Sequence, residues 1–481
     1  MSTHTGSRLE SQVQRLASNG VALAAGGIVA QLAFTFLEIL VARKLGAEAY
    51  GVFVTAYAWT VLGAFLMEFG TPLWTVQEGS RNHERIPRLL GSGLTVNFAL
   101  FVLLYLLVVV AANTLAPNPV LGLLVIILPY GLILTLQAAL AAVYSSYQTM
   151  HVNAFFQGIA PVAVLLTYLL YAANDLNLAQ VGYSYVLGSG IVTGVWFVLT
   201  LRRVRPRFSS RNLRATLSSS YQYGLTGILG HVYYRADVIL LSLLAGLREA
   251  GIYAAAFKLV ELVYKVAVLS GRVFSPAMFK ASHESDKAFQ ILSSMMTRSL
   301  AIAGLTAGVI TFVTAEELIL FMFGEKYAAS VPVLRVLGGV MAARCMMIAL
   351  QVLLSSIDLH FQRVAGLGIT VIAHIGASAF LIPRFGAQGA AWAALSSGVV
   401  LLLLYGWSSS RQGDFRHLRR LLVPSCLAAI IAATASIADA NVLTRAVVSV
   451  AAFFITLFIA GLVRRDEVSF VVRSVFANGR Q

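Results

Sequence analysis

The sequence predicts an all-α polytopic membrane protein with about 14 transmembrane helices, in two pseudo-symmetric six-helix lobes plus two C-terminal helices. Of its 481 residues, 58% are hydrophobic and only 11% are charged, and the mean hydropathy is +0.81. A soluble domain carries roughly twice that share of charged residues. Apolar runs follow one another along nearly the whole chain. Its two halves resemble each other when one is shifted by 200 residues over the other.

Each predicted span is an apolar run of about 20 residues, the length that crosses the hydrocarbon core of a bilayer. Turn-forming residues separate the runs, as in "NTLAPNP" at Asn113–Pro119 and "DANVLTR" at Asp439–Arg445. The spans lie at roughly 18–42, 52–70, 90–114, 119–141, 153–173, 179–203, 221–246, 250–278, 294–314, 330–356, 362–382, 386–408, 419–438 and 442–464.

The distribution of Lys and Arg predicts how the chain is oriented in the membrane. When successive loops are assigned to alternate sides, one side receives about 22 of these residues and the other about 7. The richer side is expected to be cytoplasmic, which places both termini in the cytoplasm. Orientation therefore explains the net charge of +15 better than nucleic-acid binding does.

The loop with the densest arginine cluster joins the sixth and seventh spans and predicts a linker between two lobes. Before the first span, Leu9, Val13 and Leu16 recur at helical spacing, which predicts a short amphipathic helix at the membrane surface. The predicted organisation is an amphipathic N-terminus at 1–17, an N-lobe at 18–203, a cytoplasmic linker at 204–220, a C-lobe at 221–408, two further helices within 409–464 and a cytoplasmic tail at 465–481.

The two lobes are predicted to be copies of one another. A shift of 200 residues places "KLGAEAYGVFVTA" (Lys44–Ala56) over "LAGLREAGIYAAA" (Leu244–Ala256) and matches Gly51 with Gly251. A second similarity pairs Gln180–Gly188 with Ala387–Leu395. Copies of six helices keep the same orientation, so the repeats are expected to be parallel, related by an axis along the membrane normal.

Three motifs resemble a known family of membrane proteins. They are "ARKLGAEAYGVF" (Ala42–Phe53), "LFMFGEKYAASVPVLRVLG" (Leu320–Gly338) and "LIPRFGAQGAAWA" (Leu381–Ala393). Their order along the chain is similar to that of the Wzx-type flippases, the polysaccharide-transport branch of the multidrug/oligosaccharidyl-lipid/polysaccharide (MOP) exporter superfamily. The resemblance implies two lobes around a central cavity that moves a polyprenyl-diphosphate-linked glycan from the cytoplasmic to the outer leaflet. Its partners would be that glycan, membrane lipids and other polysaccharide-assembly proteins.

Charged residues within the predicted spans are the candidate functional residues, because a charge near mid-membrane costs about 2.5 to 3.5 kcal/mol unless it faces protein, water or a ligand. Lys258, Glu261, Lys265 and Arg272 fall on one stripe of a single helix. With Arg235, Asp237 and Arg344, they leave the second lobe with a surplus of positive charge that suits a diphosphate. The candidate substrate-binding residues are Arg235, Lys258, Lys265, Arg344, Arg272 and Gln31, and the possible coupling residues are Glu38, Glu68, Glu261 and Asp237.

Structural roles remain open for these charges. Glu261 and Lys265 have the spacing of an intrahelical ion pair, Arg272 could extend to the membrane surface, and Glu38 could pair with Arg43 or Lys44. Alternative functions are a peptidoglycan lipid-precursor flippase, a multidrug exporter of the same superfamily, or a membrane glycan polymerase or glycosyltransferase. We expect a transporter rather than an enzyme, because no acid pair accompanies His or metal ligands in a large loop. No cofactor or metal is expected.

Overall fold

The structure is a computed structural model that describes residues 26–173, 177–208, 210–284, 286–410, 451 and 453. This part of the chain is helical and contains no strand. Its contacts divide it into two compact units. The first unit holds the residues up to Ala255 together with Ile382–Ala387, and the second holds Ala256–Leu381 and the described residues from Gln388 onward.

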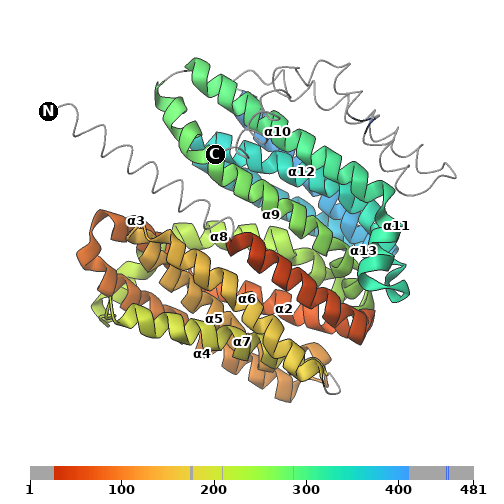
Figure 1. The fold of residues 1–481 in the computed structure, drawn as a ribbon, viewed down its shortest axis with the longest axis horizontal. Coiled ribbons are helices and arrows are strands. Elements are labelled where there is room, and N and C mark those ends of the chain that lie inside the picture. The colour runs from red at the N-terminus through yellow and green to blue at the C-terminus, as the bar shows by residue number, and fades with distance from the viewer. Residues whose placement is uncertain are drawn as a thin grey trace, which may run out of the picture. The chain divides into compact units, whose positions relative to one another are not determined.

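The first unit is built from long helices joined by short turns (Figure 1). Helix α5 packs against α2, α4 and α7, while α8 packs against α2, α3 and α4. The elements are a helix over residues 26–45, α2 (Ala47–Glu68), α3 (Thr71–Arg81), η1 (His83–Arg85), α4 (Ile86–Thr114), α5 (Pro119–Ser146), α6 (Met150–Ala172), α7 (Leu178–Leu201), α8 (Ser210–Leu244) and the start of α9 (Leu247–Glu284).

The second unit is centred on α12, which packs along α10. Small residues allow this approach: a Cβ atom added to Gly308 would lie 2.5 Å from the carbonyl oxygen of Gly338. The elements that follow α9 are α10 (Asp286–Val313), α11 (Ala315–Phe323), η2 (Glu325–Tyr327), α12 (Ser330–Ser356) and α13 (His360–Ser410).

Capping residues fix the position at which several of these helices begin. The side chain of Asn118 accepts a hydrogen bond from the backbone N–H of Val120 at 2.9 Å, and Pro119 occupies the first position of α5. Asn177 and Gln180 form a capping box at the start of α7, with both hydrogen bonds at 2.9 Å. Each cap satisfies backbone donors that a helix start leaves without partners.

The all-α membrane fold predicted from the sequence is confirmed, since the described part of every predicted span up to residue 408 falls on a helix. Within the described ranges, nine helices are long and apolar enough to cross a membrane. The spans predicted at 362–382 and 386–408 form one element, α13, which is kinked at Gly386 (φ 54°, ψ −131°). The span at 419–438, the amphipathic segment at 1–17 and the tail at 465–481 lie outside the described residues, and of the span at 442–464 only residues 451 and 453 are described.

Two short helices and one helix start differ from the prediction. Phe69 (φ 43°) and Gly70 (φ 74°) interrupt the helix between α2 and α3, while α11 precedes the turn at Gly324 (φ 85°). Helix α8 begins at Ser210, inside the segment predicted as the linker 204–220. The segment predicted as the linker therefore includes the first turns of α8.

The predicted 200-residue repeat appears in the structure as a reciprocal contact between α2 and α9. A Cβ atom on Gly51 would lie 3.2 Å from the backbone nitrogen of Gly251, and one on Gly251 would lie 3.0 Å from that of Gly51. Each would also collide with a carbonyl oxygen, of Leu247 and Ala47 respectively, which are again 200 residues apart. Equivalent positions of the two copies thus cross backbone to backbone, which requires glycine at both positions.

A second repeated feature escaped the sequence analysis. The turns after α5 and α12 each place a non-glycine residue at φ 58°, namely Gln148 and Asp358, which are 210 residues apart. The backbone N–H of the next residue donates to the carbonyl five residues earlier in both turns, at 2.9 Å (Thr149 to Tyr144, and Leu359 to Leu354). The two copies therefore share a turn geometry that their amino acids hardly reveal.

Candidate functional site

The charged stripe of α9 begins with a buried ion pair. Lys258 Nζ donates to Glu261 Oε2 at 2.6 Å, and the two side chains are only 5% and 8% exposed. The sequence also allowed a pair between Glu261 and Lys265, because residues three apart and residues four apart are both neighbours on a helix. The ion pair with Lys258 neutralises the deeper end of the stripe, so Lys258 contributes little net positive charge there.

The other end of the stripe is more accessible. Lys265 is half-buried and Arg272 is exposed, one and two heptads beyond the buried Lys258 on the same helix. The three cations therefore form a series in which exposure rises along α9. Lys265 and Arg272 are the members that an anionic ligand could reach in this structure.

Arg344 lies on α12 against the same stretch of α9. Its guanidinium carbon lies 4.8 Å from the ring centroid of Phe257 and 5.6 Å from that of Tyr264, and the residue is 3% exposed. A cation over an aromatic face away from water gains about 2 kcal/mol. Phe257 and Tyr264 are the sequence neighbours of Lys258 and Lys265, so the structure brings Arg344 to the same stretch of α9.

The sequence analysis did not identify Phe257 and Tyr264 as parts of the site. They are seven residues apart, which places them on one face of α9. That spacing could have predicted a shared aromatic surface, but the arginine that packs on it comes from another helix and has no local signal.

Arg235 packs on aromatic rings of the first unit. Its guanidinium carbon lies 5.6 Å from the centroid of Tyr57 on α2 and 5.5 Å from that of Tyr234. One turn earlier on α8, His231 stacks on Phe65 with ring centroids 3.3 Å apart. Two polar residues of α8 therefore lie against aromatic residues of α2.

The buried acids of the first unit accept hydrogen bonds from tyrosines. Glu38 accepts from Tyr50 at 3.1 Å, and Asp237 accepts from Tyr253 at 2.7 Å, with the acids 6% and 1% exposed. Each acid lies within the first helix of its repeat, and each tyrosine lies near the start of the next helix. A hydroxyl donor satisfies part of a buried carboxylate's need for hydrogen bonds.

The remaining candidates of the first unit lie apart from these pairs. Gln31 Nε2 donates to Thr35 Oγ1 at 3.4 Å within its own helix. Glu68 is half-buried in the last turn of α2, where its backbone carbonyl accepts from Thr71. Lys44, a possible partner of Glu38, donates instead to the carbonyl of Ala172 at 2.8 Å.

The candidates thus form two groups, each within one unit. The second unit brings together Lys258, Glu261, Lys265, Arg272 and Arg344, and the first unit holds Arg235, Asp237, Gln31, Glu38 and Glu68. Across the residues that the structure describes, no group of three or more His, Cys, Asp or Glu side chains could hold a metal ion.

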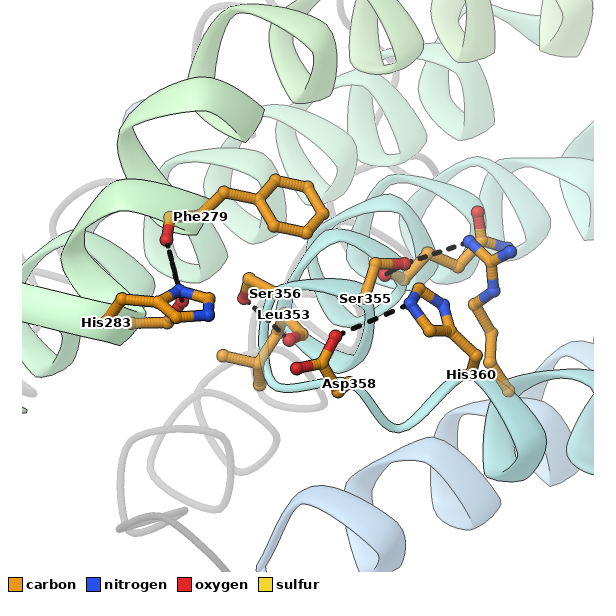
Figure 2. A network of polar contacts seen from close by, with 10 residues as sticks. Phe279, His283, Leu353, Ser355, Ser356, Asp358 and His360 are labelled. Atoms are coloured by element: carbon orange, nitrogen blue, oxygen red, sulfur yellow. Dashed lines mark hydrogen bonds and ion pairs between the residues drawn. The ribbon is translucent and has the colours of Figure 1, made fainter. Parts of the chain in front are cut away.

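A polar cluster lies at the C-terminal end of α12, next to the turn at Asp358 (Figure 2). Arg363 donates to Ser355 Oγ at 2.9 Å, and His360 Nε2 lies 3.7 Å from Asp358 Oδ1. The corresponding turn of the first unit uses Asn153, which donates to Ser145 Oγ at 3.0 Å. The second copy therefore carries charges where the first copy is neutral.

The fold defines a multi-pass helical protein, with nine helices among the described residues that are long and apolar enough to cross a membrane. The chain belongs to the family described as polysaccharide biosynthesis protein, which matches residues 16–282. A search of curated proteins finds no match.

Solved structures of MOP superfamily transporters share this fold. The lipid II flippase MurJ in an inward closed conformation superposes with a TM-score of 0.72 at 12% identity, covering 92% of this chain and 100% of that chain. An inward-facing multidrug resistance MATE family transporter gives a TM-score of 0.63 at 13% identity, covering 82% and 94%. A MOP superfamily transporter from Pyrococcus furiosus, described as having a binding pocket of reverse polarity, gives 0.60 at 11% identity, covering 82% and 95%.

Proposed function

We propose that this protein is a flippase that moves a polyprenyl-diphosphate-linked oligosaccharide across the bacterial inner membrane by alternating access, for the synthesis of O-antigen, capsule or exopolysaccharide. The family match and the fold support a transporter for polysaccharide synthesis. The observation that carries the proposal is the series of cations on α9, whose buried end is neutralised and whose accessible end is positive.

The chemistry of the cargo explains why such a series is useful. A diphosphate and its attached sugars cannot enter hydrocarbon without losing their hydration. Arg272 and Lys265 offer a planar fork and a mobile point charge to phosphate oxygens. Arg344 is fixed between rings and the Lys258–Glu261 pair is fixed by its own ion pair, so these residues shape the wall rather than capture the ligand. Arg235, which belongs to the second repeat but to the first compact unit, is a further candidate cation for the headgroup.

The polyprenyl chain would remain in the lipid while the headgroup follows these cations. Alternating access requires the two repeats to rock about the bound headgroup, exposing it first to the cytoplasm and then to the opposite side. Both termini would be cytoplasmic, in agreement with the distribution of Lys and Arg. Energy could enter through protonation of Glu38, Glu68, Glu261 or Asp237, because acids within the membrane are often functional.

A peptidoglycan lipid-precursor flippase is the second candidate. The likeness to MurJ over 92% of this chain favours it, and its cargo would carry the same diphosphate. A multidrug exporter for organic cations is disfavoured, because such cargo needs an acidic pocket and the stripe of α9 has more cations than acids.

The test reconstitutes the full chain in vesicles with three fluorescent substrates: a polyprenyl-diphosphate oligosaccharide, the peptidoglycan lipid precursor and an organic cation. We expect the oligosaccharide to reach the far leaflet, and we expect Arg235→Gln combined with Lys265→Gln to abolish that movement. Elution volume and thermal midpoint would show that the variant is folded. Movement of the organic cation alone would overturn the proposal, and preference for the peptidoglycan precursor would select the second candidate.

A further inference from the structure

Five exposed arginines gather at one end of the first unit, where α4 begins and α7 ends. We call this group the arginine platform: Arg88, Arg202, Arg203, Arg205 and Arg207. The proposed transport mechanism uses none of them. They occupy two segments that are more than a hundred residues apart in the sequence but are joined in the structure.

The chain after α7 is held firmly against the start of α4. Val204 is 4% exposed and packs in a cluster with Ile86 and Leu90 of α4 and with Ala139 and Val143 of α5. The backbone N–H of Arg207 donates to the carbonyl of Pro87 at 2.8 Å. A Cβ atom on Gly91 would lie 2.7 Å from the carbonyl carbon of Arg207, so the absence of a side chain there permits the contact. The backbone that carries the arginines is therefore fixed before any ligand binds.

The charge of the platform is not neutralised locally. Within the described ranges, the nearby Arg85 pairs with Glu78, whereas none of the five platform arginines forms an ion pair. Glu84 is the other acid close in sequence, and it is exposed. Five guanidinium groups on a fixed backbone form a surface for a multiply charged anion or for several anions.

The position of the platform indicates which anion binds. Both α4 and α7 are among the helices long and apolar enough to span a membrane, and Arg202 and Arg203 follow directly after the last residue of α7. This places the platform at the depth of the lipid headgroups. Phe208, which is 67% exposed beside Arg207, is the kind of aromatic residue that occupies a membrane interface.

We infer that the arginine platform binds the headgroups of anionic phospholipids in the adjacent leaflet, such as phosphatidylglycerol or cardiolipin. Clusters of four to eight basic residues next to a transmembrane helix attract anionic lipid in this way. The inference concerns lipid rather than cargo, so it holds whether or not the protein is a flippase.

Native mass spectrometry of the purified full chain in detergent tests this inference, with phosphatidylglycerol, phosphatidylcholine or inorganic diphosphate added. We expect the wild type to retain phosphatidylglycerol over phosphatidylcholine. The variant Arg88→Gln/Arg203→Gln/Arg205→Gln/Arg207→Gln should lose this preference by about tenfold or more, because each basic residue at a membrane surface adds to the attraction. The matched control, Lys280→Gln/Lys287→Gln, removes exposed cations elsewhere and should behave as the wild type.

A second variant keeps the inference falsifiable if the first one misfolds. Replacing the same four arginines with lysine retains the charge and should retain phosphatidylglycerol. Equal retention of both lipids by the wild type, or an unchanged preference in the glutamine variant, would overturn the inference. Displacement of phosphatidylglycerol by inorganic diphosphate would also overturn it, because the platform would then be a site for the free anion.

Discussion

Helices α2 and α9 begin alike and then diverge. Both follow a glycine with positive φ, Gly46 at 81° and Gly246 at 95°, and they cross at Gly51 and Gly251. Further along, the residues of α2 that correspond to Lys258, Glu261 and Lys265 are Ala58, Val61 and Phe65. A helix in this position therefore does not need charges to form and pack. Their presence in one copy alone supports the proposed role of these charges in binding the headgroup.

The aromatic residues of the two copies support the same contrast. In α2, Tyr57 receives a cation from another helix, Arg235 of α8, whereas α9 carries its own cations and receives Arg344 from α12. Both copies thus place arginine on aromatic rings, but only α9 adds a line of charges beside them.

The largest effect is expected from breaking the buried pair of α9. Lys258→Met alone leaves the carboxylate of Glu261 buried without its cation, which should cost about 3 to 5 kcal/mol of stability. Lys258→Met combined with Glu261→Leu makes this stretch apolar, as in α2, and should recover most of that loss. Thermal unfolding of the purified variants measures both. A double variant as unstable as the single one would show that the pair stabilises the fold by itself.

The backbone crossing of α2 and α9 should be sensitive to a side chain at either of its two glycines. Gly51→Ala and Gly251→Ala each place a Cβ atom against the backbone of the other helix, which should cost about 1 to 3 kcal/mol through overpacking. Gly122→Ala in α5 is the matched control, since an added Cβ there meets no atom within 4 Å. It should leave the thermal midpoint unchanged or raise it. Equal midpoints for all three variants would contradict the reciprocal contact.

A smaller effect is expected from Glu249, which has no acidic counterpart at position 49 of α2. Its Oε2 accepts a hydrogen bond from the backbone N–H of Ala387 at 2.8 Å, immediately after the kink of α13 at Gly386. Glu249→Ala should cost about 1 kcal/mol, as loss of a helix cap does. Glu249→Gln should keep most of the stability, and the exposed neighbour Arg248→Ala serves as the control. A thermal midpoint for Glu249→Ala equal to that of Arg248→Ala would argue against the cap.

The spans could be predicted because a bilayer demands long apolar runs, which leave a strong trace in sequence. The turns at Gln148 and Asp358 could not, because few residues match between them and their left-handed conformation is held by backbone hydrogen bonds. The kink in α13 depends on one residue, Gly386, and on a hydrogen bond to Glu249 from a distant part of the chain. The spans predicted at 362–382 and 386–408 are the two helices that meet at this kink.

The candidate site likewise has a part that could be predicted from the sequence and a part that could not. The charged residues stand out in an apolar sequence, so the stripe could be identified from spacing alone. The choice between Lys258 and Lys265 as the partner of Glu261 depends on side-chain conformation and neighbours, which spacing leaves open. The rings around Arg344 come from a different helix, so only the tertiary structure reveals them.

The most direct measurement is the rate at which a fluorescent polyprenyl-diphosphate oligosaccharide reaches the far leaflet of vesicles that contain the full chain. Lys265→Gln combined with Arg272→Gln removes the accessible cations of α9, while Lys280→Gln combined with Lys287→Gln removes exposed cations outside the stripe. We predict that the first variant, folded in the membrane, moves the cargo at least about tenfold more slowly, since charge-assisted phosphate contacts contribute about 1.5 to 3 kcal/mol each, and that the second matches the wild type. Equal rates for both variants and the wild type would contradict the assignment of the α9 cations to the diphosphate.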